Sequence, residues 1–179
     1  MCTGSSEARR RVVLCDASPL IFLAKVDRLE LIALVTKRPL VVVEAVVREV
    51  LSDRAGPVER QRLETWMSGV ERVQQEGVAL ASDALSESDR SSLAWAVENR
   101  AEWLLADERL LRRFAQTYGI KVIGFCGLLV QAAKQGHLSA QQARDCVDRA
   151  IRDHSCRLSV DVYRRILTEL EGLSDGDAE

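Results

Sequence analysis

The chain has 179 residues, of which 47% are hydrophobic and only 4% aromatic, which suits one ordinary domain with a core of Leu, Val, Ile and Ala. Its formal net charge of −2, from 25 basic and 27 acidic residues, excludes a strongly basic protein that coats nucleic acid, but not an enzyme with a local basic rim. No apolar stretch reaches the ~20 residues that span a bilayer, and residues 1–11 lack the apolar region of a signal peptide. We therefore expect a cytoplasmic protein without a membrane partner.

Short apolar segments alternate with segments of helical periodicity along the chain. The strands are expected at 12–15, 40–43, 78–80, 103–106 and 121–123. The helices are expected at 20–36 with a cap at Asp27, then at 45–51, 58–76, 86–100, 107–118, 128–135, 139–155 and 160–172. Such alternation predicts an α/β domain with a parallel sheet.

The sequence shows no internal repeat and no domain boundary. We expect a flexible N-terminus over 1–10, one domain over 11–172 and a frayed acidic tail over 173–179. Residues 139–172 form a helical C-terminal extension of that domain.

The chain offers no pattern for a zinc site. Its five cysteines include no C-x-x-C pair, and the two histidines, His137 and His154, share no ligand spacing with any cysteine. Any metal would be held by carboxylates, and therefore would be a hard cation.

Four acidic residues fall where a parallel sheet would gather them. Asp16 and Asp107 each follow a predicted strand, and parallel strands present their carboxyl ends along one edge. Asp89, in the first turn of its helix, and Glu49, about one turn into its helix, can reach the same edge. Clustered carboxylates stay ionised only with a cation among them, and oxygen ligands suit Mg²⁺ or Mn²⁺ beside a phosphate. The implied chemistry is hydrolysis of a phosphodiester.

Each of these residues also has a simpler interpretation. Asp16 and Asp107 suit helix N-caps, and Asp89 suits a capping box with Ser86. Glu49 suits an ion pair on a solvated face. A run of three arginines suits an exposed helix face, namely Arg109, Arg112 and Arg113. The joint pattern is what favours a site over these separate roles.

Four short motifs, at 13–21, 43–50, 85–96 and 104–109, resemble those of the PIN domain, the metal-dependent ribonuclease fold of VapC-type toxins. The resemblance covers about Val12 to Leu170, and 124–129 with 158–167 looks like a prokaryotic subgroup with an extended helical C-terminus. Val43 stands where the second motif usually has Pro. Ser88-Asp89 replaces the subgroup's more usual Gly-Glu, so the third acid is shorter by one methylene.

The resemblance implies a three-layer α/β/α sandwich with a central, mostly parallel sheet. It implies that Asp16, Glu49, Asp89 and Asp107 are the catalytic residues and the ligands of Mg²⁺ or Mn²⁺. Ser18 would support the first acid or the substrate. The arginines near the fourth acid would bind substrate phosphates, namely Arg109, Arg112 or Arg113.

The resemblance also implies partners. It suggests a homodimer that cleaves RNA as a toxin and is silenced by a small antitoxin, for which 58–76 is either a docking face or part of the core. Two alternatives stay open, a PIN-fold module that binds RNA or a protein without cutting, and a DNA-directed nuclease of the same fold.

Overall fold

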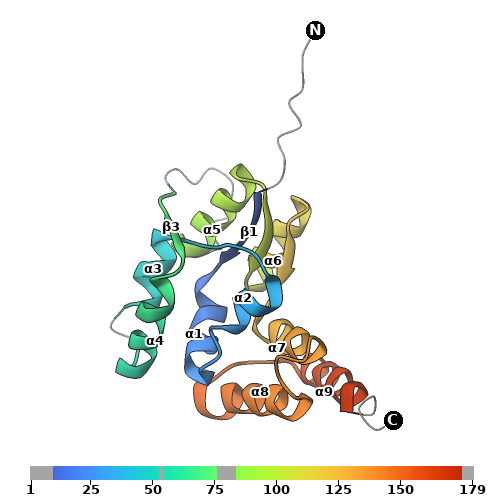
Figure 1. The fold of residues 1–179 in the computed structure, drawn as a ribbon. Coiled ribbons are helices and arrows are strands. Elements are labelled where there is room, and N and C mark those ends of the chain that lie inside the picture. The colour runs from blue at the N-terminus through green and yellow to red at the C-terminus, as the bar shows by residue number, and fades with distance from the viewer. Residues whose placement is uncertain (1–9, 53–54, 76–83, 175–179) are drawn as a thin grey trace.

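The computed structural model describes residues 10–52, 55–75 and 84–174, and a single sheet lies at its centre (Figure 1). Within these residues the strands stand in the order β3-β2-β1-β4-β5, and every recorded pairing is parallel. The strands are β1 (Arg10–Cys15), β2 (Leu40–Val43), β3 (Glu71–Val73), β4 (Ala101–Leu105) and β5 (Lys121–Ile123).

The helices between and after the strands largely follow the predicted periodicity. They are α1 (Ala17–Val26), α2 (Leu31–Thr36), α3 (Glu44–Val50), α4 (Pro57–Met67), α5 (Glu87–Glu98), α6 (Arg109–Thr117), α7 (Phe125–Lys134), α8 (Ala140–His154) and α9 (Val160–Ser174). Asp27 adopts the left-handed conformation that ends α1, so the predicted cap between two short helices is confirmed.

The helices cover the sheet on both faces, which gives the three-layer sandwich that the resemblance implied. From β1 the chain steps outward to β2 and β3, and then returns to β4 and β5 on the other side of β1. Right-handed connections place the helices of these two stretches on opposite faces. Accordingly α5 and α6 contact the sheet and each other, whereas α1, α2 and α7 pack together elsewhere.

One predicted helix is wrong in its second half. The helix expected over 58–76 ends at Met67, and residues 71–73 form the edge strand β3 instead. The chain turns at Ser68 and Gly69, and Val41 then pairs with Glu71. Sheet pairing therefore overrides a charged segment that has helical periodicity but little apolar surface to bury. The strand expected at 78–80 lies outside the described residues.

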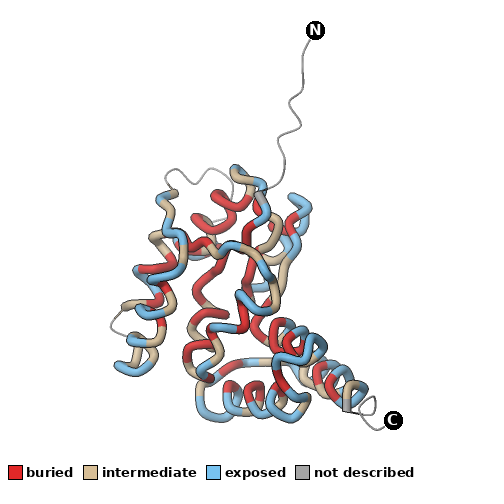
Figure 2. The backbone as a smooth tube through the Cα atoms, viewed as in Figure 1, coloured by how far each residue is buried: buried red, intermediate tan, exposed pale blue. Residues whose placement is uncertain are grey.

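The core is aliphatic, as the composition predicts, and it runs along β1 and α1 through the middle of the molecule (Figure 2). Val13, Leu14 and Leu20 are fully buried, and each such side chain contributes roughly 1.5–3 kcal/mol by leaving water. This packing fixes the height of β1 within the sheet, and with it the position of the residue that follows the strand.

The carboxyl ends of the central strands are level. Cys15 pairs with Leu105, and Leu105 pairs with Ile123, so the residues after β1, β4 and β5 emerge at one edge. Helices α7, α8 and α9 gather at that end of the molecule (Figure 1). The predicted acids therefore lie between the sheet edge and the C-terminal helices.

Candidate active site

A cavity of about 510 Å³ opens at this edge of the sheet, and all four predicted acids line it. We call it the acidic pocket and define it by Asp16, Glu49, Asp89 and Asp107. Ser18, expected beside the first acid, lines the same pocket. Residues from four separate predicted motifs thus converge on one space.

Asp16 follows β1 directly and is only 2% exposed. It occupies the N-cap position of α1, but its side chain does not cap that helix, so the capping interpretation does not account for it. Ser92 of α5 donates a hydrogen bond to Asp16 Oδ1 at 3.0 Å. Burial, reinforced by the negative charge of Asp89 and then Glu49, raises the pKa of Asp16 well above its usual value. Asp16 is therefore a buried acid that a cation would stabilise.

Helix α5 positions the second and third acids. Ser88 donates a hydrogen bond to Glu49 Oε2, which ties exposed Glu49 of α3 to the start of α5. Asp89 Oδ2 accepts a hydrogen bond from the Ser86 amide at 3.2 Å, and its own amide donates to Ser86 Oγ at 3.1 Å. The capping box predicted for Asp89 is thus present, and the same residue still lines the pocket and acts on the pKa of Asp16.

Asp107 lies across the pocket, just beyond β4. The N-cap of α6 is Glu108, whose carboxylate accepts the Leu110 amide at 3.1 Å, so Asp107 is free of the role that the simpler interpretation gave it. Asp107 Oδ1 instead accepts the Phe125 amide of α7 at 2.9 Å. Its other oxygen, Oδ2, is buried with no hydrogen-bond partner.

Burial raises the pKa of Asp107, while the Phe125 amide and the charge of Arg112 act in the opposite direction. A buried oxygen without a partner costs free energy unless a ligand satisfies it. The unsatisfied Oδ2 therefore favours a bound cation.

The donors in the pocket suit a hard cation. Cys126 and Cys156 also line it, but burial raises the pKa of the Cys156 thiol to about 11 and that of Cys126 further, so both are neutral thiols rather than thiolates at neutral pH. Carboxylate oxygens then remain as the charged donors. Within the described part of the chain, no three His, Cys, Asp or Glu side chains already stand close enough to hold one metal ion.

The three predicted arginines do not share one position. Arg109 and Arg112 line a second cavity of about 1230 Å³ that adjoins the acidic pocket, whereas Arg113 is exposed on α6 and lines neither cavity. Arg112 Nη1 also donates to the Ala106 carbonyl at 2.8 Å, so this side chain supports the backbone next to Asp107.

Several residues of the site carry no signal that singled them out in the sequence. Ser88 and Ser92 are spaced like any two residues of one helix face. Gly124 follows β5, and a Cβ there would collide with Asp107 Oδ1 and approach Arg112 Nη1 to 2.7 Å. Its position after a strand, at the same edge as Asp16, was the one available clue. The connector 155–158 between α8 and α9 lines the pocket. Its sequence has no periodicity that would predict this position.

No helix in the described residues is both long and apolar enough to cross a membrane.

Comparisons with known proteins identify the family. The curated proteins gave no match. Among solved structures, the chain is similar to a PilT N-terminus domain protein from the hyperthermophilic archaeon Sulfolobus solfataricus P2, with 15% identity and a TM-score of 0.48 over 65% of this chain and 89% of that one.

A family model described as a PIN domain matches residues 12–172. PIN domains are in general nucleases that use divalent metal ions. The match covers β1 from Val12 onward, the other four strands and all four acids of the pocket, and the chain belongs to the PIN-domain family.

Proposed function

We propose that this protein is a ribonuclease that hydrolyses RNA phosphodiester bonds with Mg²⁺ or Mn²⁺. The observation that carries the proposal is the buried, unpartnered Oδ2 of Asp107 in a pocket that three more acids line. Oxygen donors on a sheet edge next to open solvent fit a hard cation that keeps water and binds phosphate alongside the protein. Asp16, Glu49, Asp89 and Asp107 would hold it.

The bound cation would supply polarisation of the phosphate and activation of water. The chain's own part is to fix the acids. Ser92 holds Asp16, Ser88 holds Glu49 and the Phe125 amide holds Asp107, so three carboxylates are oriented by donors that come from helices α5 and α7. Such outer contacts fix the orientation of ligands and raise affinity for the metal.

We extend the proposal to the toxin half of a toxin–antitoxin pair. Support comes from the resemblance of the four motifs to those of VapC-type toxins. A small antitoxin that covers the acidic pocket would silence such an enzyme. Co-expression with a small protein encoded next to this one would test this part. If this protein inhibits growth as a toxin, rescue of growth is expected only if that small protein binds it.

The test of the nuclease uses mixed RNA with Mn²⁺, with Mg²⁺ and with EDTA. Cleavage is expected with metal only, and Asp16→Asn and Asp107→Asn are each expected to lower it by more than about 100-fold. Asp145→Asn is the matched control, because Asp145 is an exposed acid of α8 that does not line the pocket. Cutting that survives both pocket substitutions would contradict the assignment.

The same test separates the ribonuclease from a second candidate, the PIN-fold module that binds RNA or a protein without cutting. Such a module would bind RNA with the same affinity in the wild type and in Asp16→Asn, and would cut in neither.

Single-stranded and flapped DNA, offered at the same salt concentration, separate a DNA-directed nuclease from the ribonuclease.

A further inference from the structure

The second cavity adjoins the acidic pocket. Both are lined by Asp107, Cys126, Arg157 and Leu158. Two of these residues belong to the connector between α8 and α9, so the C-terminal extension forms part of both walls. An extended ligand that left the acidic pocket past Asp107 would reach the second cavity.

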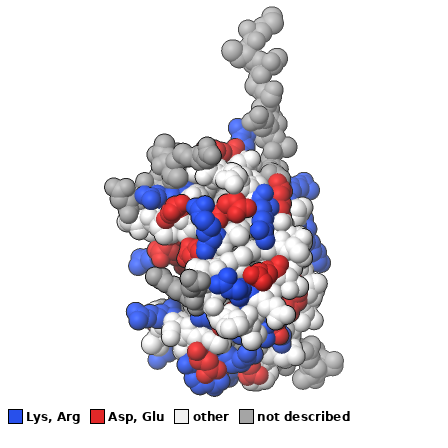
Figure 3. Space-filling view, turned by 90° about the vertical axis from the view of Figure 1, so that its left-hand side faces the viewer, with Lys and Arg blue, Asp and Glu red and all other residues white. Residues whose placement is uncertain are grey.

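The lining of this cavity is cationic. Six basic residues face it against three acidic ones, although the whole chain carries a net charge of −2. Figure 3 shows the side of the molecule that bears α3 and α4, where residues of both signs are interspersed. The excess of positive charge is thus a property of the cavity and not of that face.

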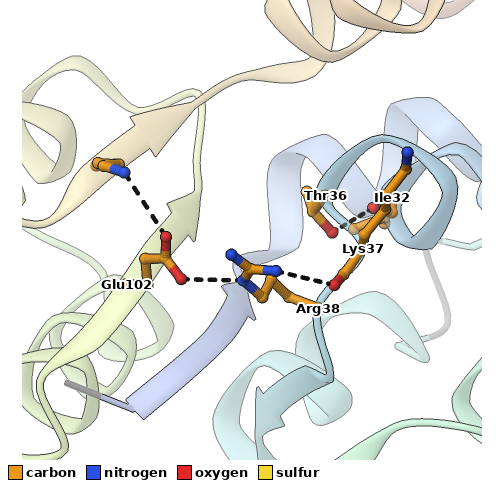
Figure 4. A network of polar contacts seen from close by, with 6 residues as sticks. Ile32, Thr36, Lys37, Arg38 and Glu102 are labelled. Carbon is orange, nitrogen blue, oxygen red and sulfur yellow. Dashed lines mark hydrogen bonds and ion pairs between the residues drawn. The ribbon is translucent and has the colours of Figure 1, made fainter. Parts of the chain in front are cut away.

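Two of the six cations form ion pairs within the protein, both with the same carboxylate. Arg38 Nε lies 3.0 Å from Glu102 Oε2, and Lys121 Nζ lies 3.6 Å from Oε1 of the same carboxylate. Figure 4 shows the Arg38 side chain reaching across to Glu102 on β4. Lys121 also sits 5.3 Å from the centroid of the Trp103 ring, which is half-buried in the cavity wall. An aromatic ring beside a cation is the surface on which unpaired bases stack.

Three other cations of the second cavity are available to a ligand, and one of them, Arg157, also lines the acidic pocket. Arg109, Arg157 and Arg165 are exposed, and none of them has an ion-pair partner among the described residues. They come from α6, the α8–α9 connector and α9, three elements that the fold brings to one groove. Long, exposed side chains without partners are suited to bind phosphates, because they need no rearrangement of internal ion pairs.

We propose that the second cavity holds single-stranded nucleic acid on one side of the bond to be cleaved, and that Arg157 contacts the phosphate closest to the acidic pocket. Arg165 and Arg109 would hold the phosphates that follow. This inference rests on the proposed nuclease function. It gives the C-terminal extension a direct part in binding substrate, beyond packing against α1 and α7.

The test measures binding without cutting. A labelled single-stranded RNA of about 12 nucleotides is titrated in EDTA across a series of salt concentrations, and anisotropy gives Kd. The variants are Arg157→Gln, Arg165→Gln and the double variant. Arg164→Gln is the matched control, because Arg164 is an exposed neighbour on α9 that lines neither cavity.

We expect both single variants to raise Kd severalfold and the double variant to raise it further. The slope of log K against log salt should become shallower by about 0.7 for each phosphate that the variant no longer binds. Arg164→Gln should change neither quantity. A merely structural role would not alter the salt slope selectively.

Two outcomes would overturn the inference. If the double variant matches Arg164→Gln in Kd and slope, the groove does not carry the strand, and an acidic protein segment becomes its better occupant. The nuclease proposal would survive that result as long as metal-dependent cutting is still abolished by Asp16→Asn. If the wild type binds neither RNA nor single-stranded DNA in EDTA, the proposed groove fails, whereas metal-dependent cutting of RNA still tests the nuclease separately. Equal dependence on Arg157 for RNA and DNA supports the groove through their shared phosphate backbone.

Discussion

Asp16 is held in a surrounding that disfavours its charge. Its pKa in the folded protein lies above the value of an unfolded aspartate, chiefly through burial. The folded state therefore binds this proton more tightly than the unfolded state does. The penalty is fully present above the folded pKa and is relieved as the pH falls toward the ordinary aspartate range. Without metal, the carboxylate destabilises the fold at neutral pH.

Replacing Asp16 with Asn should for that reason stabilise the metal-free protein. We expect Asp16→Asn to gain about 1 kcal/mol at neutral pH, or roughly 3 °C in Tm, since the amide removes the buried charge and keeps an acceptor for Ser92. The difference from the wild type should shrink as the pH is lowered. Thermal unfolding in EDTA across pH checks this, and a variant less stable than the wild type at every pH would contradict it.

Gly124 makes room for the fourth acid. The Cβ of Gly124→Ala would collide with the Asp107 carboxylate, so we expect a loss of about 1–3 kcal/mol in stability and a marked loss of metal-dependent cleavage. Gly172→Ala on α9 is the control, because Gly172 lines neither cavity. A Cβ at Gly172 meets nothing within 4 Å, and alanine in a helix should be neutral or stabilising by about 0.5–1 kcal/mol. Equal cleavage by the two variants would show that the space beside Asp107 is not needed.

At the scale of elements, α5 acts as the support of the acidic pocket. Ser88 and Ser92 lie one turn apart on it, and each donates to a different acid. The helix is fixed in turn by its contacts with α3, α6 and three strands. Helix α5 thus sets the spacing between Asp16, which follows β1, and Glu49 of α3.

Ser92→Ala should show how far this support matters. Loss of a hydrogen bond to a buried carboxyl is expected to cost about 1–2 kcal/mol and to weaken metal binding by about tenfold. Ser91→Ala is the control, because Ser91 is also buried on α5 and is not a partner of either acid. Calorimetric titration with Mn²⁺ measures the affinity, and the same Kd for both variants would contradict the supporting role.

The sequence predicts those elements whose pattern is local. The apolar run that ends at Cys15 marks the end of β1, and a second such run marks the end of β4. The acids that follow these two strands are predicted from the strand ends alone. The end of α4 and the edge strand β3 were missed, because β3 is charged and depends on pairing with β2. Ser92 and Arg157 could not be foreseen, since their roles arise from elements that lie far apart in sequence and meet only in the fold.

At the scale of the whole molecule, the C-terminal helices are part of the domain and not an appendage. Helix α8 contacts α1, and α9 contacts α7, with Ile166 and Leu170 buried among the core residues. The helices that complete the hydrophobic core therefore also deliver the connector to the acidic pocket. Folding and assembly of the site are one event in this arrangement.

Metal binding should then appear as a change in global stability. A ligand that binds only the folded state adds RT ln(1 + [L]/Kd), or about 2.7 kcal/mol at a concentration of 100 Kd. We expect Mn²⁺ to raise the Tm of the wild type and of Asp145→Asn, but to leave Asp107→Asn nearly unchanged.

The stabilisation of the folded protein by Mn²⁺ should also depend on pH in a defined direction. Protons compete with the cation for the carboxylates, and because the pKa values of Asp16 and Asp107 are raised, the competition begins at a higher pH than it would for exposed acids. The stabilisation by Mn²⁺ should therefore be fullest above these raised pKa values and fade as the pH falls through them. In EDTA the free energy of unfolding of the wild type should instead increase as the pH falls over the same range. Parallel pH dependence with and without Mn²⁺ would mean that the metal binds elsewhere, and that the acidic pocket is not its site.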